Sequence, residues 1–168
     1  KEIGRLGMNT GPNTPLSPLS EEQTQALQKI HDCFSEKEVC LLHGVTSSGK
    51  TEIYAHLIEE VLNKGKQVLY LLPEIALTTQ ITERLAGLFG DRLIVYHSKF
   101  SDNERVEIWN RLLTDDGPLL ILGVRSSLFL PFAHLGLIIV DEEHEPSFKQ
   151  QDPAPRYHAR DTAIVLAA

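Results

Sequence analysis

The sequence predicts an α/β fold in which a mainly parallel central sheet lies between two layers of helices. Two observations predict it. Short, continuous apolar runs recur along the chain, and between them lie segments whose apolar residues have helical spacing. Strands that are apolar on both faces are typical of a parallel sheet covered on both sides. A chain of 168 residues can bury one core, so we expect one domain.

The composition is typical of a soluble globular protein, with 42% hydrophobic and 23% charged residues. No apolar run approaches the length of a membrane span and no secretory signal opens the chain, so we expect a cytoplasmic protein without membrane contact. The formal net charge of −7 gives no overall basic field, although a local basic groove is compatible with it. Cys33 and Cys40 lack a metal or redox spacing and are expected to be buried free thiols.

The first part of the chain has linker composition, with three prolines among glycine, serine, threonine and asparagine. We expect residues 1–19 to be a linker from an absent upstream domain and residues 20–168 to form one lobe. Ser20–Gln23 has the spacing of a capping box, which predicts a helix that begins there. The apolar run Val39–Leu42 predicts a first strand, and Glu52–Asn63 has the spacing of the next helix.

The remaining elements follow the same alternation. A helix is predicted over Ala76–Phe89, and another opens at Ser101–Glu104, which repeats the capping-box spacing. An apolar helical pattern from Ala163 continues to the last residue, so we expect the chain to be a piece of a longer protein. Four further strands are predicted over Val68–Leu72, Leu93–Tyr96, Leu119–Leu122 and Leu137–Val140, with a short segment around Ser126–Leu130 between the last two.

Polar residues follow each predicted strand at its carboxyl end. In a parallel sheet these ends meet at one edge, and ligands of such sheets bind there. One edge of the sheet is therefore expected to carry the function. The polar clusters are Gly44–Thr51, Pro73-Glu74, His97-Ser98, Gly123–Ser126 and Asp141–His144.

The segment between the first predicted strand and its helix has the pattern of a phosphate-binding loop. It reads Gly44-Val45-Thr46-Ser47-Ser48-Gly49-Lys50-Thr51. Its backbone N–H groups would form a concave anion site at the positive end of the helix. Lys50 would reach the outer phosphates and the Thr51 hydroxyl would ligate Mg²⁺. A Gly/Ser-rich turn before an ordinary helix is the alternative, but both flanks favour a loop that binds a nucleoside triphosphate.

Acidic residues end the last predicted strand, in the sequence Asp141-Glu142-Glu143-His144. Asp141 is placed to hold the Mg²⁺ that Thr51 also touches, and Glu142 to orient or deprotonate the attacking water. A solvated acidic turn is the alternative, which the upstream loop disfavours. His144 is expected to couple the nucleotide state to a neighbouring domain, although a surface histidine accounts for it nearly as well.

Together, the glycine-bounded loop and the D-E-x-H box resemble the superfamily two, DEXH-box helicases, whose motor consists of two RecA-like lobes. The sequence from about Leu19 onward is similar to the family of primosomal replication-restart DNA helicases. The similar segments are Gly44–Tyr54, Leu72–Gln80, His97-Ser98, Glu104-Arg105 with Trp109, Gly123–Phe132, Asp141–His144, Lys149-Gln150 and Arg156–Asp161.

This resemblance implies a three-layer RecA-like P-loop NTPase lobe of an ATP-dependent DNA helicase that binds and remodels stalled replication forks. It implies ATP and Mg²⁺ as cofactors. Single-stranded and forked DNA, primosome proteins and single-strand-binding proteins are the implied partners. The family's zinc-binding cysteines and the arginines of the second lobe would lie elsewhere. We therefore expect this chain alone to bind nucleotide and to hydrolyse it poorly.

The resemblance also implies roles for single residues. Gln23 lies where these helicases contact adenine, while the capping box accounts for it equally well. Phe148–Arg160 resembles an aromatic-rich loop that couples DNA binding to hydrolysis, the alternative being a proline-rich surface loop with two anchoring aromatics. Helix capping is the alternative for Thr78, Ser126 and Ser127. The implied DNA-binding residues are Pro73, Glu74, Thr78, Gly123, Arg125, Ser126, Phe148, Lys149 and Tyr157.

Two rival interpretations remain open. The chain could belong to an RNA-directed DExH helicase or to another DExH DNA translocase, against which Gly123–Phe132 argues. It could instead act only as a module that binds nucleotide and DNA weakly without catalysis. The nucleic acid that stimulates hydrolysis would distinguish the first alternative from the DNA helicase. Turnover by the isolated chain would contradict the second alternative.

Overall fold

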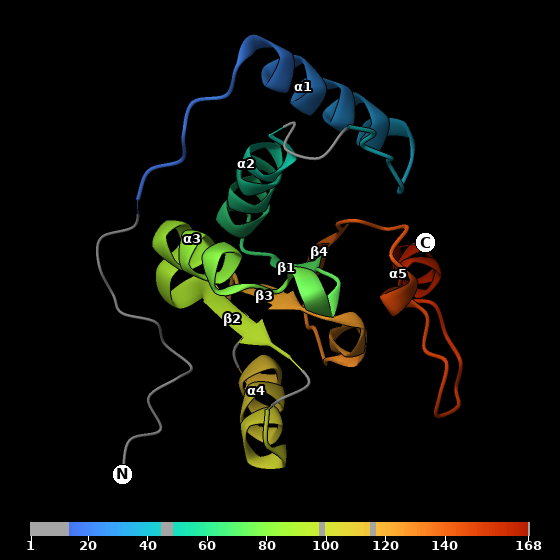
Figure 1. Cartoon of the computed structure of the whole chain (residues 1–168). Coiled ribbons are helices and arrows are strands. Elements are labelled where there is room, and N and C mark those ends of the chain that lie inside the picture. Colours follow the sequence, from blue (N-terminus) through green and yellow to red (C-terminus); the bar gives the residue numbers. More distant parts are fainter. Residues whose placement is uncertain (1–13, 45–48, 98–99, 115–116, 168) are drawn as a thin grey trace.

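The computed structural model describes residues 14–44, 49–97, 100–114 and 117–167. Its centre is a four-stranded parallel sheet with the strand order β2-β3-β1-β4. The parallel sheet and the helices around it confirm the predicted α/β fold (Figure 1). The strands are β1 (Gln67–Leu71), β2 (Leu93–Tyr96), β3 (Leu120–Gly123) and β4 (Leu135–Val140).

Side chains of β1 alternate between two hydrophobic clusters, one on each face of the sheet. Val68, Tyr70 and the following Leu72 point into the first cluster, and Leu69 and Leu71 into the second. All five residues of β1 are buried, because β1 lies between β3 and β4 and is covered on both sides. This double burial explains why the strand reads as a continuous apolar run.

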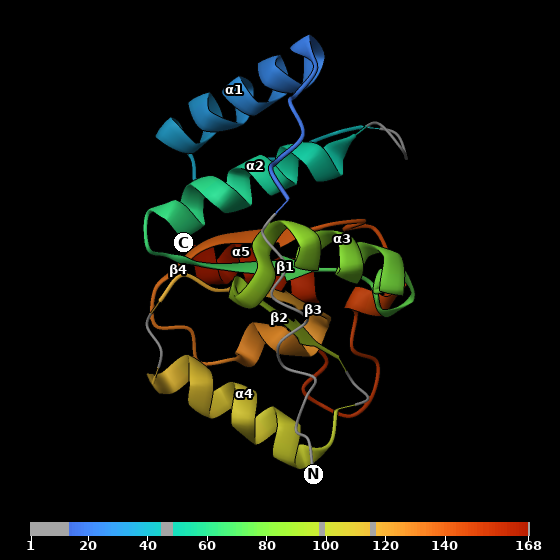
Figure 2. The same ribbon diagram turned by 90° about the vertical axis from the view of Figure 1, so that its left-hand side faces the viewer.

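Helices cover both faces of this sheet. Helices α2 (Lys50–Asn63) and α3 (Thr79–Phe89) pack on the first face, and α4 (Asp102–Thr114) and α5 (Ala159–Ala167) on the second. Helix α1 (Glu21–Glu36) lies on the outer side of α2 (Figure 2), and Leu137 of β4 packs against the cluster that the two helices form. None of the described helices is both long and apolar enough to cross a bilayer.

The two predicted capping boxes are present. Ser20 Oγ accepts a hydrogen bond from the N–H of Gln23 at 3.2 Å, and Gln23 Oε1 accepts one from the N–H of Ser20 at 2.8 Å. Ser101 and Glu104 exchange the same pair of bonds at the start of α4. Each pair satisfies N–H groups that the first helical turn leaves without a partner, which fixes where the helix begins.

The predicted strand Val39–Leu42 is wrong. These residues follow α1 as irregular backbone, and none of the described residues pairs with them in a ladder. Leu41 is 75% exposed, and β4 forms the edge of the described sheet. An apolar run becomes a strand only when a neighbouring strand accepts hydrogen bonds from its N–H groups and donates to its C=O groups. The predicted helix Ala76–Phe89 also begins later than expected, because Thr78 accepts a hydrogen bond from the N–H of Ile81 and caps α3.

Short 3-10 helices join several of the main elements: η1 (Glu74–Ala76), η2 (Gly90–Arg92), η3 (Arg125–Phe129) and η4 (Pro146–Phe148). The segment predicted around Ser126–Leu130 corresponds to η3. Cys33 and Cys40 are free thiols but only partly buried, which differs from the expected full burial.

Candidate functional site

The carboxyl ends of the four strands lie at one edge of the sheet, as predicted, because the strands are parallel. Pro73 follows β1, His97 follows β2, Arg125 follows β3 and Asp141 follows β4. The fifth polar cluster reaches this edge by a different route, since the N-terminus of α2 carries it and not the predicted strand.

The described part of the phosphate-loop motif is organised around the start of α2. Gly49 has a φ of 76° and is the residue that precedes the helix. A Cβ at this position would collide with the side-chain nitrogen of Gln23, so the position suits glycine in backbone angle and in space. Lys50 begins α2, and its ammonium group donates a hydrogen bond to the carbonyl of Gly44 at 2.7 Å.

Four predicted nucleotide-binding residues, Val45, Thr46, Ser47 and Ser48, lie outside the described residues. Their flanks are nonetheless close to each other, as the contact between Lys50 and Gly44 shows. Thr51 follows Lys50 in the first turn of α2 and is partly buried.

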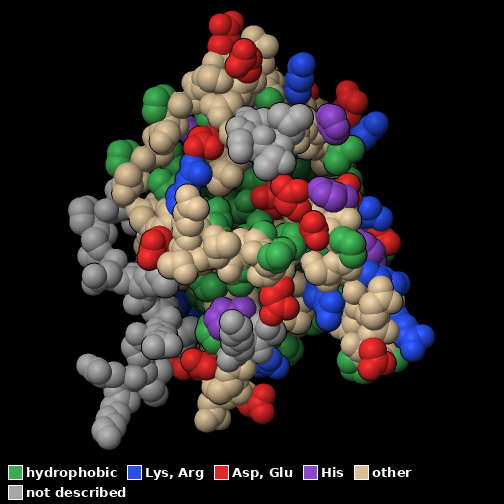
Figure 3. Space-filling model, in the orientation of Figure 1, with side chains coloured by type: hydrophobic (Ala, Val, Ile, Leu, Met, Phe, Trp, Pro, Cys, Tyr) green, Lys and Arg blue, Asp and Glu red, His purple; other side chains and the backbone are tan. Residues whose placement is uncertain are grey.

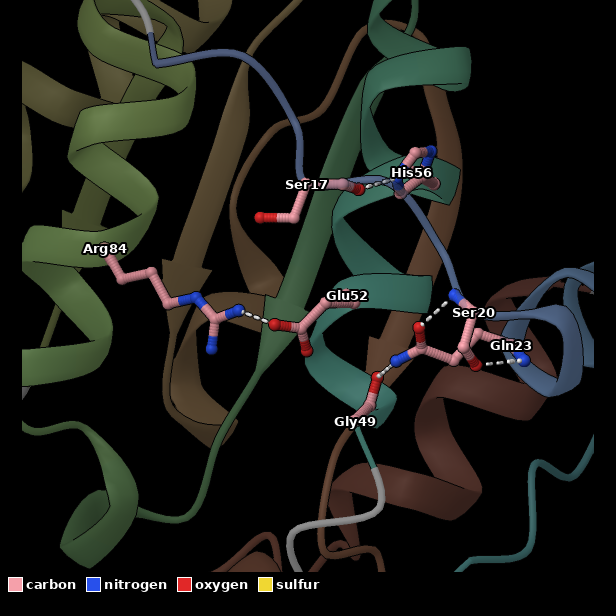
Figure 4. A network of polar contacts seen from close by, with 7 residues as sticks. All are labelled: Ser17, Ser20, Gln23, Gly49, Glu52, His56 and Arg84. Atoms are coloured by element: carbon pink, nitrogen blue, oxygen red, sulfur yellow. Dashed lines mark hydrogen bonds and ion pairs between the residues drawn. The ribbon is translucent and has the colours of Figure 1, made fainter.

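Gln23 connects the capping box to the phosphate-loop motif. Its amide nitrogen donates to the Gly49 carbonyl at 3.2 Å, while its oxygen accepts from Ser20 (Figure 4). The capping function is therefore present. The same side chain borders the start of α2.

The chain segment before α1 lies against α2 and α3. The N–H of Thr14 donates to the Gly87 carbonyl at 2.7 Å, and the Ser17 carbonyl lies 2.9 Å from His56 Nε2 (Figure 4). An ion pair between Glu52 and Arg84 joins α2 to α3 beneath this segment. Residues 14–17 are thus held on the lobe, although their composition is that of a linker.

A cavity of about 400 Å³ brings the two strongest sequence motifs together. Gly44 and Lys50 line one side of it, and Asp141, Glu142 and His144 line another. Figure 3 shows acidic side chains beside a histidine in the middle of this face. A positive side chain and the carboxylates therefore share one cavity, as a site for a phosphate–metal complex requires.

Asp141 is fixed through both carboxylate oxygens. Tyr70 donates its hydroxyl to Oδ2 at 2.9 Å, and the N–H of Glu142 donates to Oδ1 at 3.1 Å. Burial raises the pKa of Asp141, and the charge of Glu142 raises it further. The two hydrogen bonds and the charge of Lys50 lower the pKa of Asp141 without cancelling the effect of burial.

Glu142 has a left-handed backbone, with a φ of 51°, which non-glycine residues rarely adopt. This conformation turns the chain sharply at the end of β4. His144 Nε2 lies 3.6 Å from a Glu142 carboxylate oxygen, while Glu143 accepts a hydrogen bond from Arg160 at 2.7 Å. Unusual backbone angles of this kind are concentrated at functional sites.

The side chains present fit Mg²⁺ bound together with a nucleotide. Among the described residues, no group of three or more His, Cys, Asp or Glu side chains is placed to hold a metal alone. Mg²⁺ in nucleotide sites takes one or two protein oxygens, the remaining ligands being phosphate and water. The ionised Asp141 carboxylate and the Thr51 hydroxyl supply oxygens of that type.

The predicted aromatic-rich loop is a hairpin tied to η3. Arg125 donates to the carbonyls of Ser147 at 2.9 Å and Lys149 at 3.3 Å, and Lys149 Nζ donates to the Arg156 carbonyl at 3.0 Å. Lys149 also forms an antiparallel bridge with His158. Lys and Arg side chains gather at this end of the face in Figure 3. The loop is thus folded back on itself beside Arg125.

Phe148 differs from its predicted role. Its side chain is 1% exposed and lies in the cluster beneath the sheet, so it anchors the hairpin and does not present a ring to a base. Phe129 of η3 is 53% exposed and meets the Tyr157 ring edge to face, with centroids 4.9 Å apart. Phe129 is therefore the exposed ring of this region, and Tyr157, which is partly buried, supports it.

The other predicted DNA-binding residues differ in exposure. Three of them, Glu74, Thr78 and Ser126, are exposed near the carboxyl ends of the strands. Pro73 and Gly123 lie at the same edge of the sheet and are buried. Thr78 caps α3, so the capping alternative is confirmed for it, and the residue as a whole is exposed. Ser127 is buried and donates its hydroxyl to the Val124 carbonyl, which makes it structural.

Two features of the site were not predicted from the sequence. One is the contact of Tyr70 with Asp141, and the other is the exposure of the Phe129 ring. Tyr70 lies in the middle of an apolar run and 71 positions before its partner Asp141, so no local pattern connects them. Phe129 was part of a motif, but nothing in its sequence neighbours distinguishes it from buried Phe148.

Comparison with known proteins gives a consistent result. The chain matches the DEAD/DEAH box helicase family over residues 20–166. It is 48% identical over 152 residues to "Replication restart protein PriA" of Bacillus subtilis, covering 89% of this chain and 19% of that protein. The protein of the same name from Haemophilus influenzae is 49% identical over 166 residues, covering 97% of this chain and 22% of that protein. That of Synechocystis sp. is 44% identical, covering 97% and 20% respectively.

These relatives are much longer than the chain. It spans about a fifth of the length of each of them.

Proposed function

The chain belongs to the DEAD/DEAH box helicase family, and we propose that it is the ATP-binding motor lobe of a PriA-type ATP-dependent DNA helicase. Residues 20–168 are the lobe in this proposal, and residues 1–19 are the linker to an upstream domain. The full-length protein binds stalled replication forks and remodels them for restart. Its partners are single-stranded and forked DNA, primosome proteins and single-strand-binding proteins.

The cavity between the start of α2 and the end of β4 carries this proposal. It holds Gly44 and Lys50 together with Asp141 and Glu142, although these pairs are almost a hundred residues apart in sequence. An ordinary turn before a helix has no reason to face a carboxylate that is held by two hydrogen bonds. A nucleoside triphosphate with Mg²⁺ accounts for the cation, the carboxylates and the helix N-terminus at once.

In this proposal each predicted residue of the nucleotide site has a defined task. Lys50 binds the outer phosphates of ATP beside the N-terminus of α2. Thr51 and Asp141 would hold Mg²⁺, which would supply positive charge next to the phosphates. Glu142 orients the attacking water and accepts its proton. Gln23 contacts the adenine base.

DNA binds along the same edge of the sheet, on the side of β3. Arg125, Lys149 and exposed Ser126 contact the backbone of a single strand, and Tyr157 with Phe129 stacks on its bases. Glu74 and Thr78 border this path at the end of β1. Pro73 and Gly123 contribute backbone only, since their side positions are buried.

Coupling between DNA and nucleotide passes through the D-E-E-H turn. Glu143 holds Arg160, which follows the hairpin, while Glu142 and His144 line the nucleotide cavity. His144 lies beside Glu142 and transmits the nucleotide state to a second lobe. This chain alone, without residues from that lobe, binds nucleotide and hydrolyses it slowly.

The test is Lys50→Ala in the full-length protein, with exposed Lys29→Ala on α1 as the matched lysine control. We expect DNA-stimulated ATP hydrolysis to be lost in Lys50→Ala and kept in Lys29→Ala, with DNA affinity similar in both. Hydrolysis at the wild-type rate in Lys50→Ala would refute the site.

An RNA-directed helicase or another DExH translocase is the alternative proposal. The assay that separates them measures ATP hydrolysis with forked DNA, single-stranded DNA and RNA. Greatest stimulation by forks supports replication restart, whereas stimulation by RNA alone keeps the motor lobe and excludes the DNA assignment.

A further inference from the structure

Tyr70 carries a hydroxyl group at a buried position of the sheet where an apolar side chain would be sufficient for packing. It lies near the end of β1, between Leu69 and Leu71, and is 0% exposed. A buried phenol hydroxyl without a partner is costly, so its hydrogen bond determines whether tyrosine is tolerated there. That partner is Asp141, whose Oδ2 accepts the bond at 2.9 Å.

Neighbouring side chains hold the ring of Tyr70 in place, which restricts the position of its hydroxyl group. Tyr54 of α2 meets it edge to face, with centroids 5.7 Å apart and an interplanar angle of 75°. Ile58 of α2 belongs to the same buried cluster. Because the ring is surrounded by buried side chains, the Asp141 carboxylate has to adapt to the phenol and not the reverse.

Asp141 is anchored at three points by its neighbours. Its N–H donates to the Leu71 carbonyl at 3.0 Å, its Oδ1 accepts from the Glu142 N–H, and its Oδ2 accepts from Tyr70. A carboxylate has about four acceptor positions, so two remain for the cavity. Removal of the phenol hydroxyl would free Oδ2 to rotate and would leave the carboxylate plane set by one bond only.

We infer that Tyr70 is a positioning residue that orients the Asp141 carboxylate toward the Mg²⁺ of the nucleotide site. This inference rests on the proposed function. Hydrogen-bond partners of metal-ligating carboxylates fix the direction of the ligand oxygen, and their loss typically costs about 10–100-fold in metal affinity or activity. Tyr70 acts through Asp141 and touches neither metal nor nucleotide.

The experiment compares Tyr70→Phe with wild type in the full-length protein. The ring stays and only the hydroxyl is lost, so the packing of the cluster is kept. Tyr96→Phe, on β2, is the matched control for removal of a phenol hydroxyl elsewhere on the sheet. The first readout is Mn²⁺ affinity of the ADP-saturated protein, measured by electron paramagnetic resonance, and the second is ADP affinity in EDTA.

We expect Mn²⁺ affinity to fall about tenfold or more in Tyr70→Phe, with ADP affinity in EDTA unchanged, and both to stay at wild-type values in Tyr96→Phe. The Mg²⁺ concentration for half-maximal ATP hydrolysis should rise by a similar factor. In an Asp141→Asn background, Tyr70→Phe should no longer change Mn²⁺ affinity, because the two residues act as one unit.

The failures are distinguishable. Unchanged Mn²⁺ affinity in Tyr70→Phe, with tight Mn²⁺ binding by wild type, overturns the role of Tyr70 and leaves the proposed function intact. Equal losses of Mn²⁺ affinity and metal-free ADP affinity also overturn it, because they indicate general damage to the lobe. Absence of Mn²⁺ binding by wild type with ADP overturns the proposed function itself.

Discussion

Gly49→Ala is the substitution whose cost can best be worked out from the backbone. Gly49 has a φ of 76°, where an alanine costs about 1–2 kcal/mol in left-handed strain. The new Cβ would also displace the Gln23 amide and break its bond to the Gly49 carbonyl, which costs about 0.5–1.5 kcal/mol. Alanine also reduces the conformational entropy of the unfolded chain, which stabilises the folded state by about 0.4–1 kcal/mol.

The structure provides a control with almost the same backbone. Gly65, at the other end of α2, has a φ of 74°, and a Cβ there would meet nothing within 4 Å. Gly65→Ala therefore carries the strain and the unfolded-state gain without the collision. The difference between the two variants isolates the contact with Gln23, which we expect to be about 1 kcal/mol.

The assay is equilibrium urea unfolding of this chain, together with nucleotide affinity. We expect Gly49→Ala to lower the free energy of unfolding by about 1–2 kcal/mol and Gly65→Ala by about 1 kcal/mol less. In a Gln23→Ala background the difference should disappear, because the collision is removed. Equal destabilisation by both alanines with Gln23 present would refute the reasoning.

The remaining predictions concern single side chains of the two sites. Burial raises the folded-state pKa of Asp141, so the ionised carboxylate opposes folding. The folded chain therefore loses stability as the pH rises through the folded-state pKa of Asp141. Asp141→Asn should therefore abolish hydrolysis yet make the metal-free chain more stable at pH 7, and the gain measured by urea unfolding should vanish below about pH 4. A variant less stable than wild type at pH 7 would contradict this. Phe129→Ala should weaken single-stranded DNA binding by about 1–3 kcal/mol in a fluorescence titration with little change in stability. Phe148→Ala should instead lose about 3–5 kcal/mol of folding free energy, and a mere loss of DNA affinity there would restore its predicted stacking role.

The sequence was sufficient for features that depend on neighbouring residues. Both capping boxes formed as their spacing predicted, because the hydrogen bonds involved span three residues. The parallel sheet and its functional edge followed from strands such as β1, which is apolar because it is covered on both faces.

Sequence reasoning failed where the outcome depends on distant residues. Val39–Leu42 is apolar enough for a strand, but strand formation depends on a partner, and its described neighbours leave Leu41 75% exposed. Phe148 and Phe129 look alike in sequence, and only the packing of the second cluster separates a buried anchor from an exposed ring. The bond between Tyr70 and Asp141 crosses from β1 to β4, and neither run of residues contains a sign of it.

The hairpin and the D-E-E-H turn are linked in a way that bears on how DNA could control hydrolysis. Arg125 holds both Ser147 and Lys149, so a strand bound at η3 would pull on both sides of Phe148. Because Phe148 is buried in the core, the proposed coupling would instead displace the part of the hairpin that leads into α5. In the first turn of α5, Arg160 donates a hydrogen bond to Glu143, the residue after Glu142. The left-handed backbone of Glu142 is then the place where a small displacement would redirect the carboxylate that is proposed to activate water, which makes its unusual angle part of the proposed coupling.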